Sequence, residues 1–179
     1  MKSLLVLAHW IDALNDLFAK LAKWAIFAAC AISAANAFVR YTFSISSNGF
    51  IEIQWYLFAV CVMFGAPQVL RVNEHVRVDV LYGIYPSRGK VLVDLMGLCL
   101  FLLPLTLYIA YAALPVLTQM YVSQEMSSNA GGLIRWPAML TIPVGMVLVA
   151  LQGFSEIVKR VGWLMHVYEM DTHYERPLQ

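Results

Sequence analysis

Glu52 and Arg40 are the charged residues of this sequence best placed to do chemistry beside apolar segments. Glu52 begins one long apolar segment, and Arg40 follows the end of the segment before it. A carboxyl group in such a place is able to carry a proton or to pair with a guanidinium group. Consecutive antiparallel helices bring these two ends to the same depth, so the sequence favours an Arg40–Glu52 ion pair. Contact with a partner or a passing solute is the alternative.

A second charged group, which includes a histidine, follows the apolar segment that Glu52 begins. It consists of Arg71, His75, Arg77 and Asp79. The pattern is compatible with a solvated loop, and equally with an element that docks on another subunit or on anionic lipid headgroups. Residue types and spacing do not decide between these two roles.

The other reactive side chains form no catalytic or metal-binding motif. The histidines all lie outside the apolar segments, at His9, His75, His166 and His173. The sequence therefore lacks the paired imidazoles of a membrane haem subunit. The three cysteines lie in different apolar segments without a CxxC pair, and GxSxG, HExxH and P-loop motifs are absent. We expect no enzymatic activity, no cofactor and no metal site.

The distribution of charge indicates the class of protein. Of the 179 residues, 61% are hydrophobic and 13% are charged, whereas about 25% are charged in an ordinary soluble domain. Four segments contain no Asp, Glu, Lys or Arg, namely 24–39, 53–70, 95–124 and 136–155. A soluble amphipathic helix must carry a polar face, so this block pattern indicates a polytopic membrane protein. The net charge of +1 and the lack of a basic surface segment argue against nucleic-acid binding.

The apolar segments predict an all-α membrane protein with four transmembrane helices in a single domain, 1–179. A helix needs about 20 residues to cross a hydrocarbon core of about 30 Å, so each charge-free segment is adjusted to its flanks. The spans are expected at about 22–43, 51–70, 91–117 and 134–154, and a polar tail at 155–179.

Positive charge predicts the orientation of these spans, because Lys and Arg are retained on the cytoplasmic side of a membrane. One side receives Lys2, Lys20, Lys23, Arg71, Arg77, Arg88, Lys90, Lys159, Arg160 and Arg176. The other side receives Arg40 and Arg135. Both termini and the tail are therefore predicted to be cytoplasmic, and the loops at 43–49 and 118–134 to face outward.

The N-terminal segment 3–21 is predicted to be an amphipathic helix that lies in the membrane interface or against a partner. Its apolar residues recur every three or four positions. This apolar stripe includes Leu7, Ile11, Leu14 and Phe18. Polar residues such as Asp12 soon interrupt the apolar run, so the segment is not interpreted as a cleaved secretory signal.

One run of residues around the second span matches a known family pattern. The run contains Glu52, Trp55, Gly65-Ala66, Arg71 and His75-Val76-Arg77-Val78-Asp79. With the plan of four spans and both ends inside, which covers about the whole chain, it resembles the small membrane subunit of tripartite ATP-independent periplasmic (TRAP) transporters. In that family a Gly-Ala pair ending the second span is followed by an Arg and a His-x-x-Val-Asp-like element. The prolines of the fourth span, Pro137 and Pro143, are a further similarity.

The resemblance implies a non-catalytic scaffold subunit in the bacterial inner membrane. Its partners would be a large multi-span membrane subunit that carries the sodium and substrate sites and a periplasmic solute-binding protein that captures an organic acid, with membrane lipid around them. We expect the apolar stripe and the group at Arg71, His75, Arg77 and Asp79 to contact the large subunit. The outer loops at 46–50 and 123–132 are expected to help present the docking surface for the binding protein.

Two other functions remain compatible with the sequence. One is a self-sufficient four-helix transporter that is coupled to protons through Glu52, although this residue lies at a span boundary. The other is an anchor or assembly subunit of a different membrane complex. Both alternatives share the four-span plan.

Overall fold

The chain folds into long helices. The computed structural model describes residues 1–45, 47–72 and 85–170. In chain order the helices are α1 (Lys2–Phe43), α2 (Asn48–Val72), α4 (Ser87–Met96), the π-helix η1 (Gly97–Leu102), α5 (Leu103–Ser123) and α6 (Trp136–Leu164). Since α4, η1 and α5 follow one another without a break, they form one rod from Ser87 to Ser123.

The predicted all-α fold with four candidate spans is confirmed for the described residues. Four helices are long and apolar enough to cross a membrane, and the rod formed by α4, η1 and α5 is the third of them. The first differs most from the prediction, because 3–21 is not a separate helix. It continues into the predicted span at 22–43 as one helix of 42 residues. At 1.5 Å per residue α1 is about 63 Å long, twice the thickness of a hydrocarbon core.

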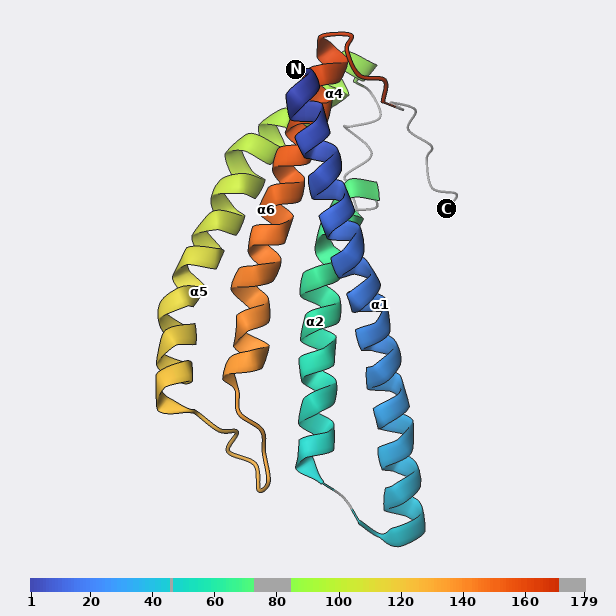
Figure 1. Cartoon of the computed structure of the whole chain (residues 1–179), viewed down its shortest axis with the longest axis vertical. Helices are drawn as coiled ribbons and strands as arrows, with labels where there is room; N and C mark the ends of the chain where they lie inside the picture. Colours follow the sequence, from blue (N-terminus) through green and yellow to red (C-terminus); the bar gives the residue numbers. More distant parts are fainter. Residues whose placement is uncertain (46, 73–84, 171–179) are drawn as a thin grey trace.

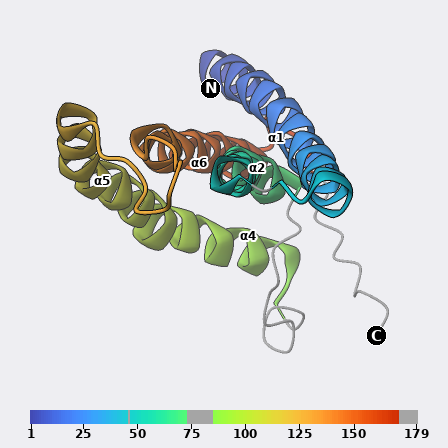
Figure 2. The ribbon, with the colours of Figure 1, turned by 90° about the horizontal axis from the view of Figure 1, so that it is seen from below.

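The four long helices lie side by side in the order α5, α6, α2 and α1 (Figures 1 and 2). Helix α2 packs against α1 and α6, and α6 also packs against α1 and α5. The N-terminus and the C-terminal end of α6 lie at one end of the bundle, which we call the terminal end. The C-terminal ends of α1 and α5 lie at the opposite end, which we call the loop end (Figure 1).

Helix α6 forms the centre of the bundle. In an apolar stretch of 18 residues of α6, 44% of the residues are buried, whereas 6% are buried in the corresponding stretch of α2. Close packing depends on small residues at the contacts. A Cβ atom added to Gly145 of α6 would lie 2.6 Å from the Cβ atom of Met63 in α2 and 2.9 Å from its carbonyl oxygen. A glycine at this position therefore allows the two backbones to approach.

The face of α1 that packs inside the chain consists mainly of small residues and overlaps only partly with the apolar stripe that was predicted to meet the membrane interface or a partner. Its buried residues are Ala8, Ile11, Asn15, Ala19, Ala22, Ala25 and Ala29. Of the predicted apolar stripe, Ile11 is buried, and the ring of Phe18 packs edge to face on Phe64 with 5.0 Å between ring centres. Leu7 and Leu14 point outward as expected, at 46% and 41% exposure.

The outward face of α1 is continued by two large residues that the predicted stripe does not contain. Trp10 is 72% exposed and Leu17 is 56% exposed. We call Leu7, Trp10, Leu14 and Leu17 the outward face of α1. Beyond Ala29 no residue of α1 is buried, so the last third of the helix, nearest the loop end, has little packing within the chain.

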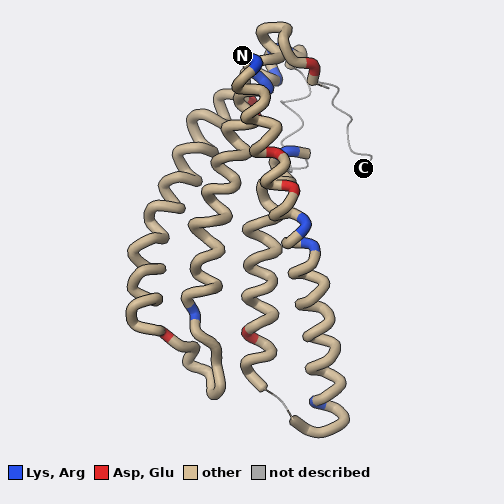
Figure 3. Tube along the Cα trace, viewed as in Figure 1, with Lys and Arg blue, Asp and Glu red and all other residues tan. Residues whose placement is uncertain are grey.

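The predicted tail also differs in part. Its first ten residues, 155–164, belong to α6. Glu156, Lys159 and Arg160 in this part of the helix are buried, although the sequence placed them in a solvated segment. Figure 3 shows charged residues gathered towards the terminal end, while the middle of α5 and of α6 carries none. The terminal end is thus a packed region with buried charges.

Candidate functional site at the two ends of the bundle

A cluster of buried ion pairs joins three helices at the terminal end. We call Asp12, Asp94, Glu156, Lys159 and Arg160 the terminal cluster. The Lys159 ammonium lies 2.7 Å from Oδ2 of Asp12 and 2.9 Å from Oε1 of Glu156. The guanidinium of Arg160 contacts Oε2 of Glu156 at 2.5 Å and Oδ2 of Asp94 at 3.2 Å. The chain of pairs runs from α1 through α6 to α4.

Neutral polar side chains complete this cluster. Asn15, Gln152 and Ser155 are essentially inaccessible to solvent. The amide of Asn15 donates to Oε1 of Gln152 at 2.7 Å, and the Gln152 amide donates to Oδ1 of Asp12 at 2.9 Å. The Ser155 hydroxyl also donates to Oδ1 of Asp12, at 2.9 Å. The polar face of α1 is therefore turned toward α6, where each donor finds an acceptor.

Arg71 attaches α2 to the same region. Its guanidinium forms a two-point contact with the carboxylate of Asp16, through Nη1 to Oδ2 at 2.9 Å and Nη2 to Oδ1 at 2.8 Å. Nη1 also donates to the backbone carbonyl of Asp12 at 3.3 Å. Arg71, expected at a contact with another subunit, thus binds within its own chain. His75, Arg77 and Asp79, the rest of that predicted group, lie outside the described residues.

The main effect of these contacts is to fix how the helices align. A buried ion pair adds little net stability, because removing both charges from water costs about as much as their attraction returns. Removing one partner is costly, at about 3–5 kcal/mol, since the other is left buried and unpaired. Any slide of α1 along α6 would separate Asp12 from Lys159 and Gln152, so the cluster sets the alignment of these two helices.

A second polar cluster is centred on Glu52 at the loop end. Glu52 is 3% exposed. Its Oε1 accepts hydrogen bonds from the hydroxyl of Ser127 and, at 2.8 Å, from the amide of Asn129. Its Oε2 accepts the backbone N–H of Leu133 at 2.6 Å. We call these four residues the loop cluster.

The expected Arg40–Glu52 ion pair is wrong. The carboxylate of Glu52 is occupied by the loop between α5 and α6, and Arg40 is exposed near the end of α1. The prediction assumed that residues at one depth meet across neighbouring helices. A loop closer to the carboxylate supplied neutral donors instead, among them a backbone N–H that a sequence pattern does not reveal.

The loop that holds Glu52 has a defined shape. An isolated antiparallel bridge joins Met126 and Ile134, and Arg135 pairs with Glu125 at 2.5 Å. A Cβ atom on Gly132 would lie 2.6 Å from the Cβ atom of Ser127 and 3.0 Å from Oε1 of Glu52. A glycine at this position therefore lets the chain fold closely around the carboxylate.

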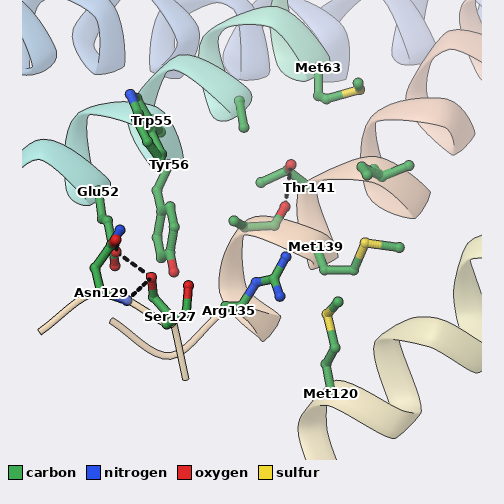
Figure 4. A pocket seen from close by; sticks show the side chains of 14 residues that line it. Glu52, Trp55, Tyr56, Met63, Met120, Ser127, Asn129, Arg135, Met139 and Thr141 are labelled. Atoms are coloured by element: carbon green, nitrogen blue, oxygen red, sulfur yellow. Dashed lines mark hydrogen bonds between the residues drawn. The ribbon is translucent and has the colours of Figure 1, made fainter. Parts of the chain in front are cut away.

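A cleft of about 590 Å³ opens beside the loop cluster. Figure 4 shows side chains from α2, α5, α6 and the loop around it. Its lining is mainly apolar and includes Trp55, Met63, Met120, Met139 and Ile142. The hydroxyl of Tyr56, also in the lining, donates to the carbonyl of Ile134 at 2.9 Å.

The charged groups that line this cleft already have partners within the chain. Glu52 is held by the loop, and Arg135 pairs with Glu125. Across the described ranges, no three His, Cys, Asp or Glu side chains converge as a metal site would require. The arrangement is suited to holding an exposed loop in one shape at the membrane boundary.

Sequence reasoning missed the neutral members of both clusters, although part of the signal was present. Gln152, Ser155, Glu156 and Lys159 recur every three or four positions, which places them on one face of α6. Asp12, Asn15 and Asp16 follow the same spacing on α1. Two polar faces in a mainly apolar chain indicate helices that meet through those faces.

A family model matches most of the chain. The model described as tripartite ATP-independent periplasmic transporters, DctQ component, matches residues 17–162. The matched range contains α2, α4, η1 and α5 completely and most of α1 and α6. It includes the whole loop cluster and, apart from Asp12, the terminal cluster. No curated protein and no solved structure matches the chain.

Replacing Lys159 with Met should destabilise the isolated protein by about 3–5 kcal/mol, because Asp12 and Glu156 lose their shared cation. The midpoint of unfolding in detergent measures this effect. Lys20→Met, at an exposed position of α1, is the matched control and should change the midpoint little. Adding Asp12→Asn to Lys159→Met should recover part of the loss. Equal midpoints for Lys159→Met and Lys20→Met would contradict the role of the terminal cluster.

Replacing Glu52 with Gln should loosen the loop between α5 and α6. Gln retains the size of the side chain but offers one oxygen in place of two, so a loop donor loses its acceptor. Hydrogen exchange of the backbone amides at 127–134 should become faster. Glu125→Gln changes a half-exposed carboxyl group of the same loop and should have the smaller effect. The assignment is wrong if the two variants exchange alike.

Proposed function

The chain belongs to the DctQ component family of tripartite ATP-independent periplasmic transporters, and on this premise we propose that it is a scaffold subunit that braces the large transport subunit in the membrane. Membership in the family implies association with a large membrane subunit and a binding protein. The proposed scaffold role assigns transport to the large subunit. This chain holds that subunit in position and helps present the docking surface for the binding protein.

The observation that carries the proposal is the location and pairing of charge. The four charge-free segments leave no ionisable acid or base in the middle of a span, where a transport site for an ionic solute would need one. The buried charges of the terminal cluster and Glu52 are all engaged within the chain. Such a chain is built to keep a shape, and the sodium and organic-acid sites belong to the large subunit.

The orientation follows from positive charge. We assign the terminal end to the cytoplasm, because Lys and Arg are concentrated there, and the loop end to the periplasm. We propose on this basis that the chain lies in the bacterial inner membrane with both termini inside. The loop held by Glu52 then faces the periplasm, together with the connection near 46–50. These loops are the proposed contacts for the binding protein.

The outward face of α1 is the proposed contact with the large subunit at the cytoplasmic end. This face is formed by large, exposed apolar residues, namely Leu7, Trp10, Leu14 and Leu17. The polar side of α1 packs against α6 and α2. The last third of α1, beyond Ala29, also lacks buried residues and carries several alanines, which permit close approach of another helix. His75, Arg77 and Asp79, which lie outside the described residues, are proposed to fix the alignment with the large subunit.

Two alternative functions would require a different partner or a different role of Glu52. An anchor or assembly subunit of another complex would share the four spans but bind a different partner. A self-sufficient proton-coupled transporter would use Glu52 as its proton carrier. The three hydrogen bonds that the Glu52 carboxylate accepts favour its charged form, which does not favour a carrier that must gain and lose a proton.

Substituting two residues of the outward face of α1 should reduce recovery of the large subunit. In the double variant Leu7→Glu with Leu14→Glu, two carboxylates would have to be buried at the contact, so less large subunit should copurify in mild detergent. Met165→Glu, at a 57% exposed position just after α6, is the matched control. Unchanged recovery for the double variant would rule out this face. Copurification of wild-type chain with an unrelated complex would support the anchor alternative.

The purified chain should transport nothing by itself. In proteoliposomes that contain this chain alone, an imposed sodium or proton gradient should drive no uptake of organic acids. Vesicles that contain both membrane subunits and the binding protein serve as the positive control. Proton-linked flux through the chain alone, abolished by Glu52→Gln, would support the self-sufficient transporter and overturn the scaffold role.

A further inference from the structure

The face of α5 that points away from the bundle carries two tyrosines. Tyr108 is 68% exposed and Tyr111 is 73% exposed. The opposite face of α5, with Thr106, Ala110 and Ala113, is buried in the bundle. Because α5 lies at the flank of the bundle (Figures 1 and 2), its outward face meets either lipid or another protein.

Both tyrosines lie near the middle of the charge-free segment 95–124. Tyr108 follows Asp94 by 14 residues, and Tyr111 precedes Glu125 by 14 residues. No charged residue lies between Asp94 and Glu125. Each tyrosine is therefore about 21 Å along the helix from the nearer charged residue. Tyr41 and Tyr121, in contrast, lie near the loop end of their helices, where tyrosine is common in membrane proteins.

The two hydroxyl groups have no hydrogen-bond partner within the part of the chain that the structure describes. The other hydroxyls of α5 are satisfied locally, since Thr106 donates to the carbonyls of Leu102 and Leu103, and Thr118 donates to that of Pro115. A tyrosine hydroxyl is too far from its own helix backbone for such a bond. Helical side chains also lean toward the N-terminus of their helix, which directs both hydroxyls away from the loop end of α5.

A proline on the same face removes one helical backbone donor. Pro115 has no N–H, so the carbonyl of Tyr111, four residues earlier, lacks its usual helical donor. Pro115 is exposed on the same side as the tyrosines. Prolines are tolerated in membrane helices because neighbouring helices supply the missing partner. The face thus presents two hydroxyl donors and one carbonyl acceptor at a depth where hydrocarbon chains offer neither.

We propose that the face of α5 at Tyr108, Tyr111 and Pro115 docks a transmembrane helix of the large subunit that carries polar side chains at this depth. That helix supplies acceptors for the two hydroxyls and a donor for the Tyr111 carbonyl. The inference rests on the proposed function for the identity of the partner. A second copy of this chain is the other occupant considered, and the crosslinking experiment below distinguishes it from the large subunit.

This contact lies on a different helix from the outward face of α1, so the two surfaces are separately testable. The α5 face engages the large subunit through hydrogen bonds within the membrane, whereas the α1 face engages it through apolar packing at the terminal end. Removal of the two hydroxyls alone, with the rings retained, isolates the polar part of the α5 contact.

The test is copurification of the large subunit with Tyr108→Phe, Tyr111→Phe and the double variant. Each lost hydroxyl should weaken retention of the large subunit about threefold, the effect of one interhelical hydrogen bond in a membrane. The unfolding midpoint of the isolated chain should stay unchanged, because neither hydroxyl bonds within it. Tyr85→Phe, at a 48% exposed position before α4, is the matched control and should retain the large subunit like wild type.

A photoreactive benzoylphenylalanine at position 111 identifies the occupant directly. It should crosslink to the large subunit in membranes that contain both proteins. Crosslinks only to a second copy, or only to lipid, would overturn the proposal, as would wild-type retention by the double phenylalanine variant. If the wild-type chain itself retains no large subunit, the proposed function fails. If wild type retains it and the double variant does so equally well, only the α5 contact is wrong.

Discussion

Lys159 lies between the carboxylates of Asp12 and Glu156 in a region from which solvent is largely excluded. A buried ammonium group in such surroundings must have its counter-charges at hand, and each counter-charge must in turn be satisfied. Groups of α6 and α4 satisfy this requirement. Arg160 pairs with Asp94, and the side chains of Gln152 and Ser155 donate hydrogen bonds to Asp12. The relative position of α1, α4 and α6 follows from this requirement, because only one alignment of the three helices pairs all the groups.

The terminal cluster also determines what the chain presents to its surroundings. Since the polar side of α1 is directed at α6 and α2, its large apolar residues point outward. In water this arrangement would be unfavourable, whereas in or beside a membrane it buries the polar groups and leaves apolar surface for lipid or a partner. One set of contacts therefore explains both the rigidity of the terminal end and the apolar surface of α1.

At the loop end a buried carboxylate is satisfied by neutral hydrogen-bond donors. Glu52 is buried without a cation, and its charge is distributed over a hydroxyl, an amide and a backbone N–H from one loop. This arrangement holds the loop against α2 and leaves an apolar cleft beside it. Between the two polar clusters α2, α5 and α6 carry no charged residue, whereas α1 carries Lys20 and Lys23. Two tyrosine hydroxyl groups in that middle region lie on the outward face of α5, where they are available for contacts with another subunit of a larger transporter.

The sequence by itself determined the class of fold and the family. Long charge-free segments are sufficient for the four helices, because the free energy of placing apolar residues in a membrane depends on composition and length and needs no knowledge of neighbours. The family pattern around Gly65-Ala66 and Arg71 was equally local. The tertiary structure alone decided which charges are buried and what they contact. Lys159 was placed in a solvated tail, and Glu52 was assigned to Arg40, because partners separated by many residues are chosen by packing and by backbone groups that residue spacing does not encode. The same limit applies to α1, whose apolar stripe was recognised but whose outward face was fixed only when Asp12 met Lys159.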